Sequence, residues 1–185
     1  EDLGADFVGW SVHKWTSAPL GTGAMYVRKS RLPDIDIAFE NRNFPDDDIN
    51  TRIPSGTVNF AAVMTIPTAV DFHFAVGGAA KERHMRGLRD RWVHAVKDLA
   101  NVEICVPDDP ARYCAITSFR LKGMTTNEAA RRVQKRLFDA YRIHTVWRGG
   151  VRNGPVIRVT PGFFSTPDDV DALARALRTE HAMLL

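Results

Sequence analysis

The stretch SVHKWTSAPLGTGAMYVR, residues 11–28, is the part of the sequence that says most about the fold. It overlaps the short apolar run 7–12 and contains a second β-rich run, 23–27. Two such runs, separated by a loop rich in Gly and Pro, predict neighbouring strands. Lys14 follows the first run, where burying an ammonium without a partner is costly. From the residues alone, a functional lysine and one that merely reaches solvent from a strand end both stay open.

Outward from this stretch the sequence changes character twice. Residues 30–59 hold three prolines, an acidic run and little periodicity, which predicts an extended excursion over a surface. Residues 59–99 have a helical pattern, with interruptions expected near Pro67 and the glycine pair 77–78. The last part of this region predicts a long connecting helix over residues 76–100.

Beyond residue 100 the predicted order is strand, strand, helix, strand, strand, helix. The strands are expected at residues 102–106, 115–121, 143–147 and 156–160. Thr125 with Glu128 three residues later forms a capping-box arrangement for the first helix, and STPDD at 165–169 starts the second. Their apolar faces are predicted to be Ala130, Val133, Leu137 and Tyr141, and Val170, Leu173, Ala174 and Leu177. This order predicts an α+β domain with helices on one face of a mainly antiparallel sheet.

The composition bounds the class of protein. With 185 residues and 44% apolar content, the chain is long enough for one substantial core or two small ones. The net charge is +3, but positive residues alternate with acidic ones and form no aromatic-interleaved stripe, so nucleic acid is not an expected partner. No apolar run approaches the roughly 20 residues of a membrane span. We therefore expect a soluble, cytoplasmic chain without membrane contact. No targeting segment is visible, but the chain opens at Glu1 within what reads as a helix end and has no starting Met, so we expect its true N-terminus to lie upstream.

The two cysteines carry no motif. Cys105 and Cys114 lie in strand-like surroundings without a CxxC pair and without a histidine at zinc spacing. We therefore expect neither a metal site nor a disulfide framework. Both are interpreted as buried apolar thiols.

The SxHK motif, the Pro/Gly loop and the GTGxxYVR run together resemble the lysine region of fold-type I, class V pyridoxal-phosphate enzymes, the aminotransferase and cysteine desulfurase superfamily. The resemblance implies that Lys14 forms the Schiff base with pyridoxal 5'-phosphate and later moves a proton at the substrate Cα. It also implies that Ser11 and His13 help to hold the cofactor phosphate. Without the resemblance, His13 is equally well explained as a residue exposed at the end of a strand.

Two further segments match the same family. Residues 55–59, SGTVN, resemble the GTxN stretch whose threonine reaches the cofactor phosphate of the neighbouring subunit, which implies this role for Thr57. By itself the segment is equally typical of a helix capped by Asn59. Arg158 lies among apolar residues, and its guanidinium fork matches a carboxylate. The resemblance implies that Arg158 binds the α-carboxylate of the substrate. The alternative is that Arg158 forms a structural ion pair with an acidic side chain of the protein.

The resemblance covers essentially all of the chain and implies an α/β fold of type I. Residues 1–75 would be the remainder of the large, cofactor-binding domain, 76–100 a connecting helix, and 101–185 a small C-terminal α+β domain. Complete members are about twice as long and place an aspartate for the pyridine nitrogen ahead of the lysine strand. We therefore expect a C-terminal portion that is inactive alone and that belongs to a homodimer with the active site at the subunit interface.

The motifs most resemble the isopenicillin N epimerase-like branch, which implies chemistry at Cα or Cβ of an amino acid: epimerisation, elimination or transamination. Residues 147–150 fall where cysteine desulfurases carry a mobile loop with a persulfide-forming cysteine, and no cysteine is present there. A cysteine desulfurase-like lyase is thus the less favoured enzyme. Trp147 and Arg148 are candidates for lining a substrate pocket, although Trp147 fits core packing as well. A non-catalytic remnant or interaction domain of the same fold is the alternative of a different class.

Overall fold

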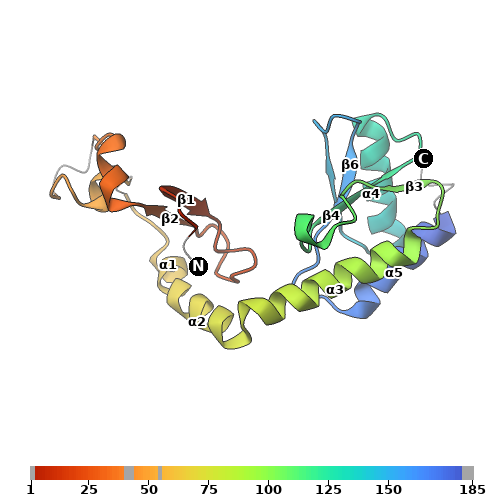
Figure 1. Cartoon of the computed structure of the whole chain (residues 1–185), viewed down its shortest axis with the longest axis horizontal. Helices are drawn as coiled ribbons and strands as arrows, with labels where there is room; N and C mark the ends of the chain where they lie inside the picture. The colour runs from red at the N-terminus through yellow and green to blue at the C-terminus, as the bar shows by residue number, and fades with distance from the viewer. Residues whose placement is uncertain (1–2, 40–43, 54–55, 181–185) are drawn as a thin grey trace. The chain divides into compact units, whose positions relative to one another are not determined.

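The computed structural model describes residues 3–39, 44–53 and 56–180. The chain separates into two compact units, Glu1–Val76 and Gly77–Leu185 (Figure 1). Each unit has a hydrophobic core of its own. Within the described ranges, no single helix is long and apolar enough to cross a membrane. The consecutive helical segments Phe60–Val76 and Gly78–Val96 meet that criterion only when they are taken together.

The first unit contains a two-stranded antiparallel sheet. Strand β1 (Phe7–Trp10) pairs with β2 (Ala24–Val27), so that Phe7 lies opposite Val27 and Trp10 opposite Ala24. Both strands were predicted, with longer bounds. The first is shorter than expected because the chain turns immediately after Trp10 instead of continuing the ladder.

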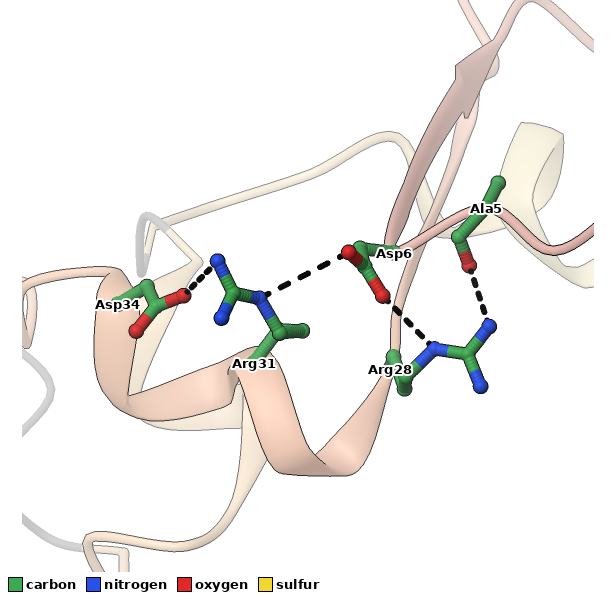
Figure 2. Close-up of polar contacts among 5 residues, drawn as sticks. All are labelled: Ala5, Asp6, Arg28, Arg31 and Asp34. Atoms are coloured by element: carbon green, nitrogen blue, oxygen red, sulfur yellow. Dashed lines mark hydrogen bonds and ion pairs between the residues drawn. The ribbon is translucent and has the colours of Figure 1, made fainter.

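A chain of polar contacts fixes the open end of this sheet (Figure 2). Arg28 donates its backbone N–H to the Asp6 carbonyl at 2.8 Å and its Nε–H to the Asp6 carboxylate at 2.8 Å. A second bond runs from Arg28 Nη2 to the Ala5 carbonyl at 3.3 Å. Arg31 continues the chain, with Nε 3.8 Å from Asp6 and Nη2 2.7 Å from Asp34. Because these side chains are largely exposed, their ion pairs contribute little stability and mainly direct the chain as it leaves β2.

The excursion after β2 contains two short 3-10 helices that the sequence does not predict. They are η1 (Lys29–Asp34) and η2 (Ile49–Arg52). The side chain of Asp48 caps η2 by accepting from the backbone N–H of Asn50 at 2.8 Å. Helices this short bury only one side chain each, Leu32 and Thr51, and therefore leave no periodic apolar pattern to detect.

The predicted helical region is divided into three helices. They are α1 (Phe60–Met64), α2 (Ile66–Val76) and α3 (Gly78–Val96). One break falls just before Pro67, which occupies the first turn of α2, where a missing N–H costs nothing. The other falls at Gly77, whose φ of 86° is a left-handed conformation that glycine adopts without a steric penalty. Both predicted interruptions are confirmed.

The second unit is built on a four-stranded antiparallel sheet. Its strands are β3 (Val102–Ile104), β4 (Thr117–Leu121), β5 (Val146–Arg148) and β6 (Val156–Val159). Their order across the sheet is β3-β4-β6-β5, and every pairing is antiparallel. The antiparallel sheet was predicted, and β6, the strand that carries Arg158, lies in its interior.

Three helices pack on one face of this sheet: α3, α4 (Asn127–Tyr141) and α5 (Pro167–Glu180). Because side chains alternate along a strand, Phe119 and Leu121 of β4 and Ile157 of β6 all face the helices, and all three are fully buried. Figure 1 shows α3 and α5 running side by side beneath the strands. The predicted apolar faces are buried, apart from a half-buried Tyr141: Ala130, Val133 and Leu137 of α4, and Val170, Leu173, Ala174 and Leu177 of α5.

The starts of α4 and α5 test the predicted capping residues. The cap of α4 is Thr126, which accepts from the Ala129 N–H at 3.1 Å, so the prediction of Thr125 is wrong by one residue. Glu128 does not close a capping box but pairs with Arg132 at 3.1 Å. The prediction for α5 is confirmed: it begins at Pro167, and the preceding Thr166 and the following Asp169 bond to one another.

The interpretation of the cysteines as buried thiols is wrong for Cys114. Cys105 is partly buried, whereas Cys114 is exposed, and both thiols are free. Cys114 lies between the 3-10 helix η3 (Pro110–Arg112) and β4, so it belongs to no strand. Residues outside a ladder do not alternate between faces, so their burial does not follow from their neighbours.

Candidate active site

The lysine motif forms a tight turn directly after β1. Val12 is 2% exposed and belongs to the core of the first unit, where it packs with Ala18. Two backbone bonds close the turn: Ala18 N–H donates to the Val12 carbonyl, and Ser17 N–H donates to the Lys14 carbonyl, both at 3.0 Å. The buried valine therefore anchors the turn, and Lys14 lies on its outer side.

Lys14 itself is exposed. Its ammonium makes no hydrogen bond or ion pair with any of the described residues. A lysine on an anchored backbone with an unengaged amine suits covalent attachment of an aldehyde, because the backbone fixes where the amine can reach. The Lys14 side chain is also open to solvent. Its position therefore fits both a functional lysine and one that merely reaches solvent from a strand end.

His13 has a defined hydrogen bond. Its Nδ1 lies 2.8 Å from the backbone oxygen of Thr22. A carbonyl oxygen only accepts, so Nδ1 carries the proton of this bond and Nε2 is left for a second partner. Thr22 is in turn fixed, because it is buried and its hydroxyl donates to the Pro19 carbonyl at 2.7 Å. Sequence reasoning did not identify Thr22, whose only signal is its place between two glycines of the GTG motif.

The structure brings three predicted site residues into one turn. Ser11 is half-buried and directly follows the last residue of β1. His13 and Lys14 follow it after the buried Val12. Thr57 belongs to the same unit but to a different segment, between η2 and α1, and its side chain is exposed. Ser55 of the same motif lies outside the described residues.

Asn59 performs the capping that the sequence offered as the alternative for this segment. Its side-chain oxygen accepts from the Ala62 N–H at 3.2 Å at the start of α1. The hydroxyl of Thr57 takes no part in this cap. The capping interpretation is therefore correct for Asn59 and leaves the role of Thr57 a prediction.

Arg158 lies in the second unit, opposite Ser118 of β4 on one side and Val146 of β5 on the other. Its Nε is buried and has no hydrogen-bond partner among the described residues. The structural ion pair that the sequence left open does not form with any carboxylate in the described ranges. Buried polar groups are normally satisfied, so the unpartnered Nε of Arg158 needs an explanation, as do the other buried side-chain atoms without a partner in the described ranges.

Arg120 is a residue that sequence reasoning missed. It is 8% exposed and donates from Nε to the Pro155 carbonyl at 3.1 Å and from Nη2 to the Gly154 carbonyl at 2.9 Å. Its Nη1 pairs with Glu103 at 2.9 Å. These bonds fix the chain just before β6 and so help to place Arg158. The only sequence signal is a charged residue inside an apolar strand.

Trp147 belongs to the core. It is partly buried, packs against the hydrophobic cluster of the second unit, and lies under the Arg131 guanidinium, 4.7 Å from the ring centroid. Of the two interpretations that the sequence left for Trp147, core packing is the correct one. Arg148, the next residue, is exposed.

Lys81 of α3 is a second lysine with unusual surroundings, and sequence reasoning missed it. It is 3% exposed and lies 4.6 Å from the centroid of the Phe163 ring. Burial lowers the pKa of Lys81 below the ordinary lysine value. A lowered pKa is common for catalytic lysines, but an amine covered by the protein is poorly placed to meet a cofactor.

The chain is a mixed α/β protein in which pairs of antiparallel strands are followed by helices, and solved structures with the same fold are fold-type I enzymes. The chain belongs to the aminotransferase class V family, which it matches over residues 1–173. Members of this family use pyridoxal phosphate.

Individual relatives agree with this placement. The chain is 24% identical over 188 residues to isopenicillin N epimerase of Streptomyces clavuligerus, covering 93% of this chain and 46% of the relative. It is 26% identical over 200 residues to a probable hercynylcysteine sulfoxide lyase of Mycobacterium tuberculosis, covering 95% and 45%. A solved cysteine desulfurase from Thermococcus onnurineus shares the fold, with a TM-score of 0.76 at 18% identity, covering 97% and 48%. The chain thus spans about half the length of the curated relatives it matches.

Proposed function

We propose that this chain functions within a pyridoxal-phosphate-dependent enzyme that acts at Cα or Cβ of an amino-acid substrate, with Lys14 as the lysine that holds the cofactor. The observation that carries the proposal is the anchored turn after β1. It presents an unengaged Lys14 amine next to His13, whose Nδ1 is held by the Thr22 carbonyl. The class V family match adds the cofactor class.

The residues of this turn fit the cofactor chemically. Because Nδ1 of His13 is engaged by the Thr22 carbonyl, Nε2 is the ring nitrogen left to contact the phosphate. Ser11 supplies a hydroxyl donor to the same anion. Bound pyridoxal phosphate supplies the electron sink for the bond broken at the substrate. Lys14 then removes or returns the proton at Cα as a general acid–base group.

The remaining site residues come from other segments. Arg158 holds the α-carboxylate of the substrate, because its buried Nε lacks a partner among the described residues and its fork suits a carboxylate. Thr57 reaches the cofactor phosphate of a second subunit, and its exposed side chain is compatible with that role. The proposal therefore includes a homodimer with the active site at the subunit interface.

The reaction type is proposed to be epimerase-, lyase- or aminotransferase-like. Similarity to an isopenicillin N epimerase and a probable sulfoxide lyase supports chemistry at Cα and Cβ. Desulfurase chemistry through an enzyme persulfide has less support because it needs an activated thiol. Burial raises the pKa of the Cys105 thiol, which disfavours the nucleophilic thiolate, and Cys114 is not in the loop after β5.

The test is to add pyridoxal phosphate to this chain and to a version extended upstream of Glu1, reduce with borohydride, and map the labelled peptide by mass spectrometry. We expect the cofactor on Lys14, loss of the label in Lys14→Ala, and retention in Lys29→Ala, a matched control at an exposed lysine after β2. Borohydride also traps lysines that react with the cofactor only weakly. The visible absorbance of the bound cofactor must therefore also disappear in Lys14→Ala and remain in Lys29→Ala.

Three outcomes contradict the proposal in different ways. A label that persists in Lys14→Ala removes that residue from the mechanism. A label on Lys81 would move the site to α3 and the second unit. Binding by neither version of the protein would favour the non-catalytic remnant.

A further inference from the structure

The sheet of the second unit has one face covered by α3, α4 and α5, and strand alternation determines which side chains lie on the other. Phe119 of β4 and Ile157 of β6 face the helices. Their neighbours Ser118 and Arg158 therefore lie on the opposite face. By the same alternation and the pairing register, that face carries Glu103, Ser118, Arg120, Val146, Arg148, Val156 and Arg158.

Three arginines share this face, and they are not equivalent. Arg120 is fully engaged by Glu103 and by two backbone carbonyls. Arg158 has a buried Nε with no partner in the described ranges. Arg148 donates only to the carbonyl of the preceding Trp147, at 3.1 Å, and forms no ion pair with any described carboxylate. Since Glu103 is already used by Arg120, no carboxylate among the described residues pairs with Arg148 or Arg158.

The strand register brings these two arginines together. Arg158 lies opposite Val146, and Arg148 lies opposite Val156, so the two arginines are diagonal neighbours on adjacent antiparallel strands. Diagonal neighbours are roughly 7–8 Å apart and within reach of one another's long side chains. Two like charges at this spacing repel, and a ligand with two anionic groups relieves the repulsion.

The backbone after Arg148 is also fixed. Gly149 lies so close to the side chain of Asn127 that an added Cβ would be 2.8 Å from its oxygen. Asn127 is the first residue of α4, so the end of β5 is held against a helix of the core. Arg148 therefore projects from a defined position, as a specificity residue requires.

We infer that Arg148 binds a second acidic group, on the side chain of the amino-acid substrate, while Arg158 binds the α-carboxylate. The inference rests on the proposed function, which assigns Arg158 to the substrate. It names the substrate class as α-amino acids with an acidic side chain, of which glutamate is the simplest probe. A guanidinium that pairs bidentately with a carboxylate discriminates strongly against the neutral amide of the same shape.

The first experiment does not depend on the cofactor. Glutarate and acetate are titrated into this 185-residue chain, and the Nε–H signals of its arginines are followed by NMR. We expect the Arg148 and Arg158 signals to shift together with glutarate, with an affinity at least about tenfold tighter than for acetate. Arg148→Gln should abolish this preference. Arg152→Gln, which removes the same charge from an exposed residue of the following loop, should retain it.

The second experiment uses the longer protein loaded with pyridoxal phosphate. Glutamate should change the cofactor spectrum at a concentration at least about tenfold lower than glutamine does, and Arg148→Gln should make the two equal. If the cofactor is bound at Lys14 but the two amino acids behave alike, the inference is wrong and the proposed function stands.

If the cofactor is bound nowhere, the proposed function fails, and the assignment of a substrate class fails with it. The glutarate titration then still decides whether the arginine pair binds a diacid. Equal binding of glutarate and acetate, or an unchanged preference in Arg148→Gln, would overturn the pairing of Arg148 with Arg158.

Discussion

The two units differ in how completely their own residues bury their apolar side chains. In the second unit a single cluster joins three helices to the sheet, with Trp92, Phe119 and Leu137 fully buried. In the first unit the buried cluster consists of Val12, Ala18 and Ala69, against which Ala24 and Ile66 pack. Small residues bury little area, so this core contributes much less hydrophobic free energy.

The hairpin of the first unit shows the consequence. Phe7, Trp10, Met25 and Tyr26 lie on its two strands and remain 47–49% exposed. A two-stranded hairpin alone is marginally stable in water. The candidate cofactor lysine is therefore carried by the unit with the smaller core, whereas Arg158 is carried by the unit with the larger one. Sites that must accept a ligand or a second subunit are expected where local stability is low.

The largest expected effect comes from truncating one buried side chain in each core. Phe119→Ala removes a fully buried ring that packs edge to face on Trp92, and should cost the second unit about 3–5 kcal/mol. Val12→Ala removes two buried methyl groups and should cost the first unit about 1.5 kcal/mol. Urea unfolding followed by the indole N–H NMR signals separates the units, since Trp92 and Trp147 lie in one and Trp10 and Trp15 in the other.

Each truncation should affect mainly the signals of its own unit. A loss of all four indole signals at one midpoint, in both variants, would mean that the chain unfolds as one cooperative body. The comparison between two units whose stability depends on their own cores would then be wrong.

Much of the fold was predictable because it rests on local pattern. The antiparallel sheet, the breaks near Pro67 and at Gly77, and the apolar faces of α4 and α5 follow from periodicity and from the backbone preferences of Pro and Gly. The strand order β3-β4-β6-β5 was not predictable, since it depends on pairing between distant segments. The 3-10 helices η1, η2 and η3 were missed because three to six residues hold too few buried positions for a period.

A smaller effect tests the one-residue error in the cap of α4. Thr126→Ala removes the hydroxyl that accepts from Ala129 and should cost about 1 kcal/mol. Thr125→Ala is the matched control, and its effect should stay within about 0.5 kcal/mol because Thr125 is exposed and does not cap the helix. The urea midpoint of the Trp92 signal measures both. The reverse order of effects would restore the cap that the sequence predicted.

The candidate site was predictable only where its residues are neighbours in the sequence. Ser11, His13 and Lys14 share one turn, so a motif was enough to group them. The bond from His13 to Thr22 joins residues nine positions apart, and the bonds from Arg120 to the chain before β6 span 34 and 35 positions. Such contacts depend on tertiary packing, so no periodic or local pattern in the sequence predicts them.

The smallest expected effect concerns acid, and it should be confined to the second unit. Asp171 of α5 pairs bidentately with Arg91 of α3, at 2.6 and 2.7 Å, and Asp98 pairs with Arg178 at 2.6 Å. The hydrogen bond from Arg91 holds the pKa of Asp171 below its usual value, and the bond from Arg178 does the same for Asp98. A carboxyl whose pKa is lower in the folded state stabilises that state above its unfolded pKa of about 3.9.

This contribution should therefore be present at neutral pH and disappear as the pH falls below about 4, through the lowered pKa values of the folded protein. Because the paired groups are exposed, salt should weaken the effect. The measurement is the urea midpoint of the Trp92 signal at pH 7 and pH 3. The double variant Asp98→Asn with Asp171→Asn should lose less of its urea midpoint between pH 7 and pH 3 than the unmodified chain. The control Asp108→Asn, at an exposed aspartate in the loop after β3, should lose as much as the unmodified chain. An unchanged loss in the double variant would show that α3 and α5 are held together by their apolar faces alone.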